Sequence, residues 1–410
     1  MRLVIALILA SMALGCGGGS NNSQDGGLCV SPSVEYVPGQ PGGWSSVCMQ
    51  PASAEVARTQ CGEVTERCDK TGVSAPSLDC VTTPVGNEPA TPAKVTLEGF
   101  ATVFSAGTDS KNIIIKVYDA TTITSPTALD GATPIGTYTT SLPASGTPPD
   151  ADVRACPTEQ ENKDRKIGCV SPVSAACDPP CEDAVTGVQF CYLKPGETSG
   201  TCVDRSRYEP RYSIPNVPTR TPLLMVTTGP SGKDDATWRM LIQENEYIST
   251  NAPECDPPNI ITSCFKDKAG AAPSFELNVN ALSRGDYASI AVAAGLPSGI
   301  PAGHGGIAGE VRDCADVRLQ NVVVGTYPPA AVTTFFNGNQ WNTLPVRGNP
   351  GTCRLGLYAA LDLEPGKVQV EAVGMVGGQL RSVGWYSALV FPDAVTVVSV
   401  NTGKPLPATP

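Results

Sequence analysis

The sequence predicts a mainly β protein with two Greek-key β-sandwich domains, a disulfide-rich N-terminal segment and a disulfide-rich insertion. Short apolar runs bounded by Gly, Pro or Asn recur along the chain, a pattern typical of successive strands. The 42 glycines and 38 prolines exceed average usage, yet 41% of the residues are hydrophobic, which indicates turn-rich domains with their own cores. The length of 410 residues gives room for about two or three such domains.

Residues 1–15 are typical of a signal peptide. Residues 3–14 are almost entirely apolar, and this run is too short for a permanent membrane helix, which needs about 20 residues. The run ends in Ala13-Leu14-Gly15-Cys16, which resembles a bacterial lipobox. We therefore expect an exported protein in which Cys16 is acylated and anchors the chain in a membrane. Ordinary cleavage after Gly15, without a lipid, is the alternative.

Residues 16–92 are interpreted as a lipidated tether followed by a Cys-rich stalk, which is either a small disulfide-stapled module or an extended segment. They hold few consecutive apolar residues, which are too few for a free-standing core. A short helix is expected from Ala54 to Gln60, with Ser53 as its N-cap. Position 17 is Gly and not Asp, which by the sorting rule of such lipoproteins favours the outer membrane, on its periplasmic face or at the cell surface.

Sixteen cysteines in an exported chain predict disulfide bonds. Acylation of Cys16 would leave an odd number, and the block of cysteines between residues 29 and 80 is itself odd. That block therefore leaves a free thiol, an intermolecular bridge or a bond to another block. The two C-terminal blocks are even and supply the pairing candidates Cys255, Cys264, Cys314 and Cys353.

The first sandwich is predicted over residues 93–250, interrupted by a disulfide-rich insertion at 141–206. Residues 238–248 match the helical and the strand period equally poorly, and a strand is favoured because a Gly-Pro-Ser-Gly turn precedes them. The expected strands are 95–104, 112–119, 135–139, 212–218, 223–227 and 238–248.

Residues 251–300 are interpreted as a connector that contains a helix from Asn280 to Ala294, ended by Gly295. The second sandwich is predicted over residues 301–402, with about seven strands, a usual Greek-key number. A short tail, 403–410, follows. The expected strands of this domain include 307–314, 319–327, 367–373, 380–386 and 395–400.

Both sandwiches carry motifs of a known family. The C-terminal domain holds Gly309-Glu310-Val311-Arg312-Asp313, then Thr352, Gly356-Leu357-Tyr358 and Leu363-Glu364-Pro365-Gly366, and the first domain holds a weaker set around Gly99-Phe100, Val117-Tyr118-Asp119 and 212–218. These motifs resemble the carboxypeptidase regulatory-like, or transthyretin-like, β-sandwich family, whose superfamily includes carbohydrate-binding-like folds. Glu364 stands where the family has a proline. The resemblance implies a β-sandwich that serves as a non-catalytic accessory domain.

No catalytic residues, metal or cofactor are expected. The single histidine, His304, lies in a Gly-rich segment, and the chain has no Gly-x-Ser-x-Gly motif. A zinc site at Cys177 and Cys181 is disfavoured by export and by the lack of a nearby histidine. Sequence-adjacent carboxylates, such as Asp234/Asp235 and Glu244/Glu246, are interpreted as solvated faces. The net charge of -11 disfavours a nucleic-acid partner.

The strongest ligand-binding candidates are Trp341, Asn339 and Asn342. An aromatic ring flanked by amides can stack on a sugar and bond its hydroxyls, although Trp341 could equally cover a sheet edge while Phe336 packs in the core. The predicted function is a non-catalytic envelope lipoprotein that acts in adhesion, envelope organisation or ligand capture, with a glycan or an envelope protein as its partner. The alternatives are a carbohydrate-binding surface protein that uses Trp341 and, less favoured, an extracytoplasmic hydrolase.

Overall fold

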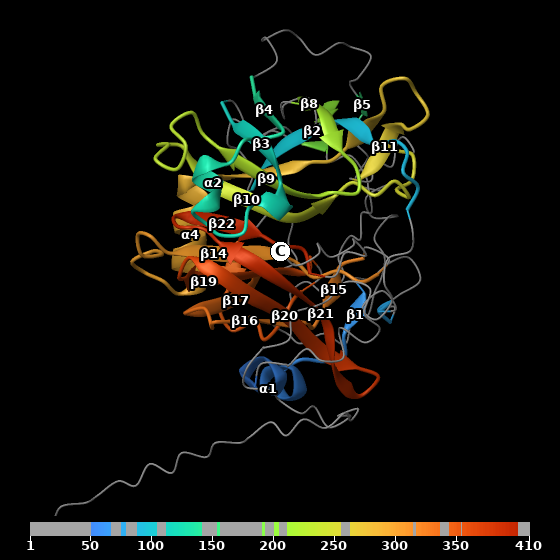
Figure 1. The fold of residues 1–410 in the computed structure, drawn as a ribbon. Coiled ribbons are helices and arrows are strands. Elements are labelled where there is room, and N and C mark those ends of the chain that lie inside the picture. Colours follow the sequence, from blue (N-terminus) through green and yellow to red (C-terminus); the bar gives the residue numbers. More distant parts are fainter. Residues whose placement is uncertain are drawn as a thin grey trace, which may run out of the picture.

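The computed structural model describes residues 51–66, 75–78, 88–104, 112–141, 154–155, 191–192, 201–204, 211–255, 263–314, 317–336, 344–353 and 355–400. The predicted signal peptide, Cys16, most of the insertion at 141–206 and the tail at 403–410 lie outside these residues. Within them the chain is mainly β and forms two packed sandwiches, which confirms the predicted fold class (Figure 1).

The first sandwich packs one sheet, β8-β2-β12-β11, against another, β4-β3-β9-β10. Side chains alternate between the faces of these strands, and the inward set, which includes Leu97, Ile115 and Phe275, forms one buried core. Its elements are β2 (Lys94–Val103), β3 (Ile114–Asp119), η3 (Ala120–Thr122), α2 (Ala128–Gly131), β4 (Gly136–Thr139), β8 (Arg211–Pro218), β9 (Pro222–Thr228), β10 (Trp238–Tyr247), β11 (Cys264–Asp267), β12 (Ser274–Glu276) and β13 (Val279–Ser283). The described part of the insertion adds a small separate sheet of β5 (Arg154–Ala155), β6 (Cys191–Tyr192) and β7 (Thr201–Asp204).

Residues 251–300 do more than connect the two sandwiches. β12 and β13 both pair in parallel with β2, and β13 also pairs with β10, so the segment completes the first sandwich. The predicted helix starts four residues later than expected, as α4 (Arg284–Ala294), because Asn280 belongs to β13. Ser283 caps α4 by accepting a hydrogen bond from the Asp286 amide, and Gly295 ends it in the left-handed conformation as predicted.

The second sandwich packs the sheet β22-β14-β19-β17-β18 against β16-β20-β21. The predicted strand at 319–327 is split because Asn321 takes a left-handed backbone conformation, φ 63°. The elements are β14 (Gly305–Glu310), β15 (Leu319–Gln320), β16 (Val323–Tyr327), β17 (Val332–Phe336), β18 (Pro345–Val346), β19 (Leu357–Leu363), β20 (Gly366–Val376), β21 (Gln379–Val390) and β22 (Ala394–Val397).

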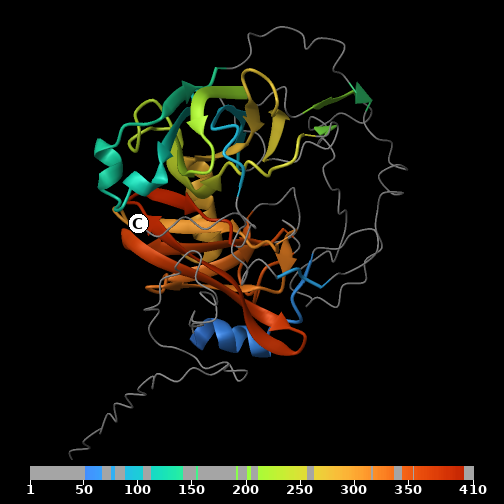
Figure 2. The ribbon, with the colours of Figure 1, turned by 45° about the vertical axis from the view of Figure 1, so that its right-hand side comes forward.

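Residues 51–66 of the N-terminal segment are docked on the second sandwich. Its helix α1 (Pro51–Thr59) packs against β16 and β20, below the sheet in both ribbon views (Figures 1 and 2). Ala57 and Val64 are buried in the core of the second sandwich, and β1 (Thr65–Glu66) pairs with β15. The helix begins before the predicted cap Ser53 because proline, here Pro51, is well tolerated in a first helical turn.

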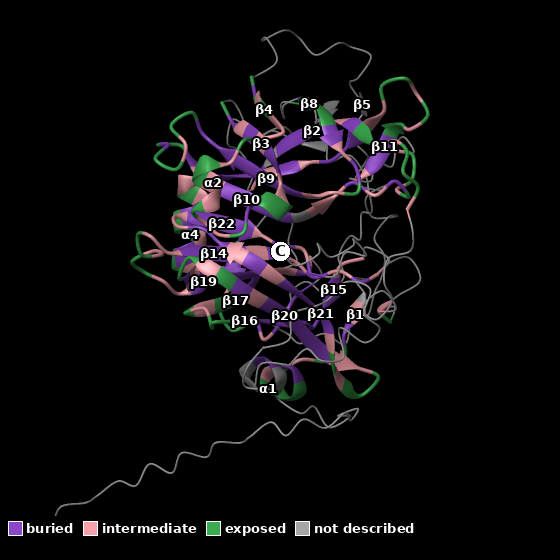
Figure 3. Ribbon diagram, viewed as in Figure 1, coloured by how far each residue is buried: buried purple, intermediate pink, exposed green. Residues whose placement is uncertain are grey.

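The two sandwiches share one sheet. β22, the last strand of the second sandwich, pairs in parallel with β10 of the first, from Met240 opposite Ala394 to Gln243 opposite Val397. An apolar cluster closes over this seam and combines Ile242 and Val226 with Phe391. In Figure 3 buried residues are prominent in the strands near the middle of the molecule, including β22. The sandwiches are therefore joined by core packing and backbone pairing.

The shared sheet predicts that both sandwiches unfold together. Ile242→Ala removes a fully buried side chain at the seam, and we expect it to lower the free energy of unfolding by about 2–5 kcal/mol. Calorimetry should show one transition that shifts as a whole. Val292→Ala, at a side chain 50% exposed on α4, serves as the control and should leave the transition unchanged. Two transitions, of which Ile242→Ala moves only one, would contradict the shared sheet.

Candidate functional site

The predicted ligand-binding residues Asn339, Trp341 and Asn342 lie outside the described residues. The chain on either side of them is described: β17 ends at Phe336, β18 begins at Pro345, and these two residues pair directly. Phe336 is buried and meets the Phe104 ring edge-on, with ring centroids 5.9 Å apart. Phe336 therefore packs in the core, as one of the two sequence interpretations expected.

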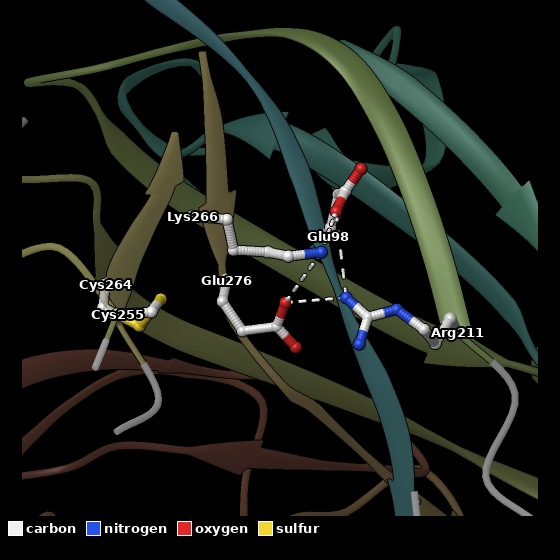
Figure 4. The surroundings of a disulfide bond; sticks show 6 residues. All are labelled: Glu98, Arg211, Cys255, Cys264, Lys266 and Glu276. Atoms are coloured by element: carbon white, nitrogen blue, oxygen red, sulfur yellow. Dashed lines mark hydrogen bonds and ion pairs between the residues drawn. A yellow bond between two sulfur atoms is a disulfide. The ribbon is translucent and has the colours of Figure 1, made fainter. Parts of the chain in front are cut away.

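A network of four charged side chains crosses the β8-β2-β12-β11 sheet (Figure 4). Glu98 and Glu276 lie directly opposite each other on β2 and β12, an arrangement that is unfavourable for two like charges. Arg211 and Lys266 relieve it from both sides. Arg211 Nη2 lies 2.7 Å from Glu276 Oε2, and Lys266 Nζ lies 2.8 Å from Glu98 Oε2. The network thus couples four neighbouring strands, with the two glutamates on the inner strands β2 and β12 and the two cations on the outer strands β8 and β11.

The burial of Glu276 distinguishes this network from an ordinary surface ion pair. Its side chain is only 3% exposed, and Oε1 is a buried atom without a hydrogen-bond partner. Cys264 lies directly opposite it on β11 and forms a disulfide bond with Cys255, seen beside the network in Figure 4. Arg211 also stacks over the Phe100 ring at 4.5 Å. The charges therefore sit in a partly dry environment, where loss of one partner is costly.

Three further cysteines with described side chains fall into two classes. Cys314 and Cys353 are disulfide-bonded, and the Cys314 amide donates to the Ser77 carbonyl, which ties the N-terminal segment to the second sandwich. Cys61 is a free, half-buried thiol, and burial raises its pKa to about 11. A thiol with this pKa is almost wholly protonated at neutral pH and is a poor nucleophile.

The single histidine forms a pair with a carboxylate at the start of β14. His304 Nδ1 lies 2.6 Å from Asp362 Oδ1, with side chains 35% and 20% exposed. A carboxylate at Nδ1 orients an imidazole as it does in catalytic triads. Within the described residues, however, the His304 ring has no hydrogen bond to a hydroxyl or thiol side chain. The pair therefore links β14 to β19, and no nucleophile is placed beside it in this part of the chain.

A second polar pair, Arg239 and Asp393, lies next to His304 and spans the seam between the sandwiches. Arg239 of β10 donates to the Asp393 carbonyl at 3.0 Å and stacks over the Tyr287 ring at 4.3 Å. The Asp393 amide in turn donates to the His304 carbonyl. Burial raises the pKa of Tyr287, with Arg239 opposing and Asp393 adding to the shift. These groups bridge the beginnings of β10, β22 and β14 and so reinforce the shared sheet.

The sequence interpretation of the paired carboxylates as solvated faces is wrong at two positions, because Asp235 and Glu244 are buried. Asp235 accepts hydrogen bonds from the amides of Thr237, Trp238 and Ser231. Burial alone would raise the pKa of Asp235, but these bonds lower it below its usual range. Asp235 therefore holds the turn that precedes β10, while Glu244 lies at the junction of the sandwiches.

Among the described residues, no group of three or more His, Cys, Asp or Glu side chains is arranged to hold a metal ion. No helix in the same part of the chain is long and apolar enough to span a membrane.

Comparison with known proteins gave no match to a family model, a curated protein or a solved structure. The resemblance to the carboxypeptidase regulatory-like family therefore stays a prediction, carried by its motifs alone.

The charge network predicts unequal effects for its two cations, which are equally exposed at 41%. Arg211→Met keeps the contact with Phe100 but leaves the buried Glu276 without its close partner. We expect a loss of about 2–3 kcal/mol, less than for a fully buried pair. Lys266→Met affects mainly Glu98, which is 26% exposed, and should cost less than about 1 kcal/mol. Urea unfolding measures both, and equal losses would show that the burial of Glu276 does not matter.

Proposed function

We propose that this protein is a non-catalytic, lipid-anchored envelope protein whose two sandwiches form one rigid body for adhesion, envelope organisation or ligand capture. The observation that carries the proposal is the shared sheet. The β10–β22 pairing and the docked α1 leave the sandwiches no independent hinge, and a rigid body of this kind suits the display of a binding surface at a fixed place. The polar clusters also join strands to one another, which is a structural use of charge.

The cysteine count supports the lipid anchor. The chain has 16 cysteines, and Cys61 is a free thiol. The fifteen others are an odd number, so at least one more cysteine lacks a disulfide partner within the chain. Acylation of Cys16 accounts for that cysteine without a second free thiol. We propose the outer membrane as the site of anchoring, on its periplasmic face or at the cell surface.

The anchor is tested by Cys16→Ser in the full chain expressed in a bacterial host. We expect the wild-type protein to incorporate labelled fatty acid and to enter the detergent phase on phase separation. Cys16→Ser should lose the label completely and move to the aqueous phase, because the acyl chains on Cys16 supply the membrane affinity of the protein. Cys61→Ser is the matched control and should behave as the wild type. Fatty-acid label on Cys16→Ser would refute the proposed anchor.

Carbohydrate binding through Trp341 is a second candidate function. It is supported by Leu344, which directly follows residues 337–343 in the sequence and is 39% exposed although apolar. An exposed apolar side chain next to an aromatic and several amides is the composition that sugar-binding sites use.

This second function predicts retention of the protein on an insoluble polysaccharide or on peptidoglycan. Trp341→Ala should reduce the retained fraction roughly tenfold or more, because one aromatic platform is lost. Tyr327→Ala is the control, since Tyr327 is also an exposed aromatic residue, 44% exposed, but lies in the opposite sheet. Equal retention of the wild type and both variants would exclude Trp341 as the platform.

A further inference from the structure

One carboxyl group is buried inside the junction of the two sandwiches. Glu244 of β10 is 7% exposed, and its two oxygens accept from the Leu389 amide of β21 at 3.1 and 3.3 Å. The Leu389 carbonyl accepts from Thr396 Oγ1 of β22 at 2.6 Å. The amide and the carbonyl of Leu389 on β21 are thus each bonded by a side chain of the seam, Glu244 of β10 and Thr396 of β22.

The surroundings of Glu244 offer it no compensating charge within the described residues. Its hydrogen-bond partner there is the Leu389 amide, and the cluster that closes over the seam is apolar. On β10, Arg239 contacts Asp393, and Glu246 accepts from Gln243. On the packed strands, Lys367 of β20 lies opposite Leu389 and is exposed, and Lys116 of β3 lies opposite Val226 and is partly exposed. Burial raises the pKa of Glu244 to about 8, against a smaller opposing effect of the Leu389 hydrogen bond.

We propose that Glu244 is a proton-dependent latch between the two sandwiches. The neutral carboxyl group costs less to bury in the apolar seam than the carboxylate does, and it still accepts a hydrogen bond from the Leu389 amide of β21. The ionised carboxylate needs water, because the seam supplies only one backbone donor to both of its oxygens. Water reaches the carboxylate only when β21 and β22 move away from β10. Deprotonation therefore favours local opening of the junction, in which β21 and β22 separate from β10.

The direction of the pH effect follows from the two states. In the closed junction the pKa of Glu244 is about 8, whereas in the opened junction the carboxyl group returns to its ordinary value of 4.5. The closed state therefore binds one more proton between these two values, and opening becomes easier as the pH rises through this window. Each pH unit should change the opening equilibrium about tenfold, and the change should level off above pH 8.

Hydrogen exchange of the full chain tests the latch. We expect protection factors of peptides from β10, the end of β21 and β22 to fall about tenfold per pH unit between pH 5 and pH 8. Peptides from β8, which lies in the opposite sheet of the first sandwich, should keep their protection. In Glu244→Gln the amide cannot ionise but can still accept from Leu389, so the seam peptides should show no fall.

Glu246→Gln is the matched control, because it neutralises a carboxylate two residues along the same strand. It should keep the pH dependence of the wild type. The latch is wrong if Glu244→Gln keeps the same pH dependence as the wild type. It is also wrong if the wild-type seam peptides have constant protection from pH 5 to pH 8, a result that does not depend on whether any variant folds.

Discussion

The parallel pairing of β10 with β22 is the interaction on which the rest of the structure depends. A strand at the edge of a sheet leaves a row of amide and carbonyl groups unpaired, and such an edge invites aggregation. Here the edge of the first sandwich and the edge of the second satisfy each other over four residues. The apolar cluster around Ile242 and Phe391 then excludes water from the seam. Without this pairing, β10 and β22 would each leave backbone amide and carbonyl groups unpaired.

This arrangement also explains why the chain order matters. β22 is the last described strand, and it pairs with a strand that precedes it by some 150 residues. The sheet of the first sandwich is therefore completed only after the whole second sandwich is in place. The N-terminal segment is also separated from its partner in the sequence. Its elements α1 and β1 pack on the second sandwich, although the strand that follows them, residues 94–103, belongs to the first. The two sandwiches and the N-terminal segment are thus interleaved in sequence.

The sequence predicted local elements well and their partners poorly. Strands such as β3 and β9 carry apolar runs bounded by turn residues, a signal contained within each strand. The docking of α1 depends on few buried apolar residues, among them Ala57 and Val64, and such a sparse pattern is also that of a stalk. The start of α4 could have been found, because Ser283 and Asp286 have the spacing of a capping pair. No local signal identifies β22 as the partner of β10.

The polar sites were harder still, because charge networks join residues that are distant in the sequence. Glu98 and Glu276 are adjacent only once β12 has paired with β2. The same applies to His304 and Asp362, since each was visible in the sequence but their contact required the β14–β19 pairing. The predicted ligand residues around Trp341 were identified from composition alone, and they remain a prediction.

Glu244, which is buried, and Glu310, which is partly buried, show how the surroundings of a carboxyl group decide its behaviour. Two arginines, Arg318 and Arg312, outweigh the effect of burial on Glu310 and lower its pKa to about 2. Glu244 has a backbone amide as its partner, and its pKa rises to about 8. The contribution of Glu310 to folding is present above pH 4.5 and is lost as the pH falls towards 2, whereas that of Glu244 is present below pH 4.5 and is lost as the pH rises through 8. The two groups together therefore favour the closed, folded chain most strongly in mildly acidic solution. Of these two glutamates, Glu244 lies in the seam. The loss of stability as the pH rises therefore acts on the junction of the two sandwiches, whereas the loss at low pH does not.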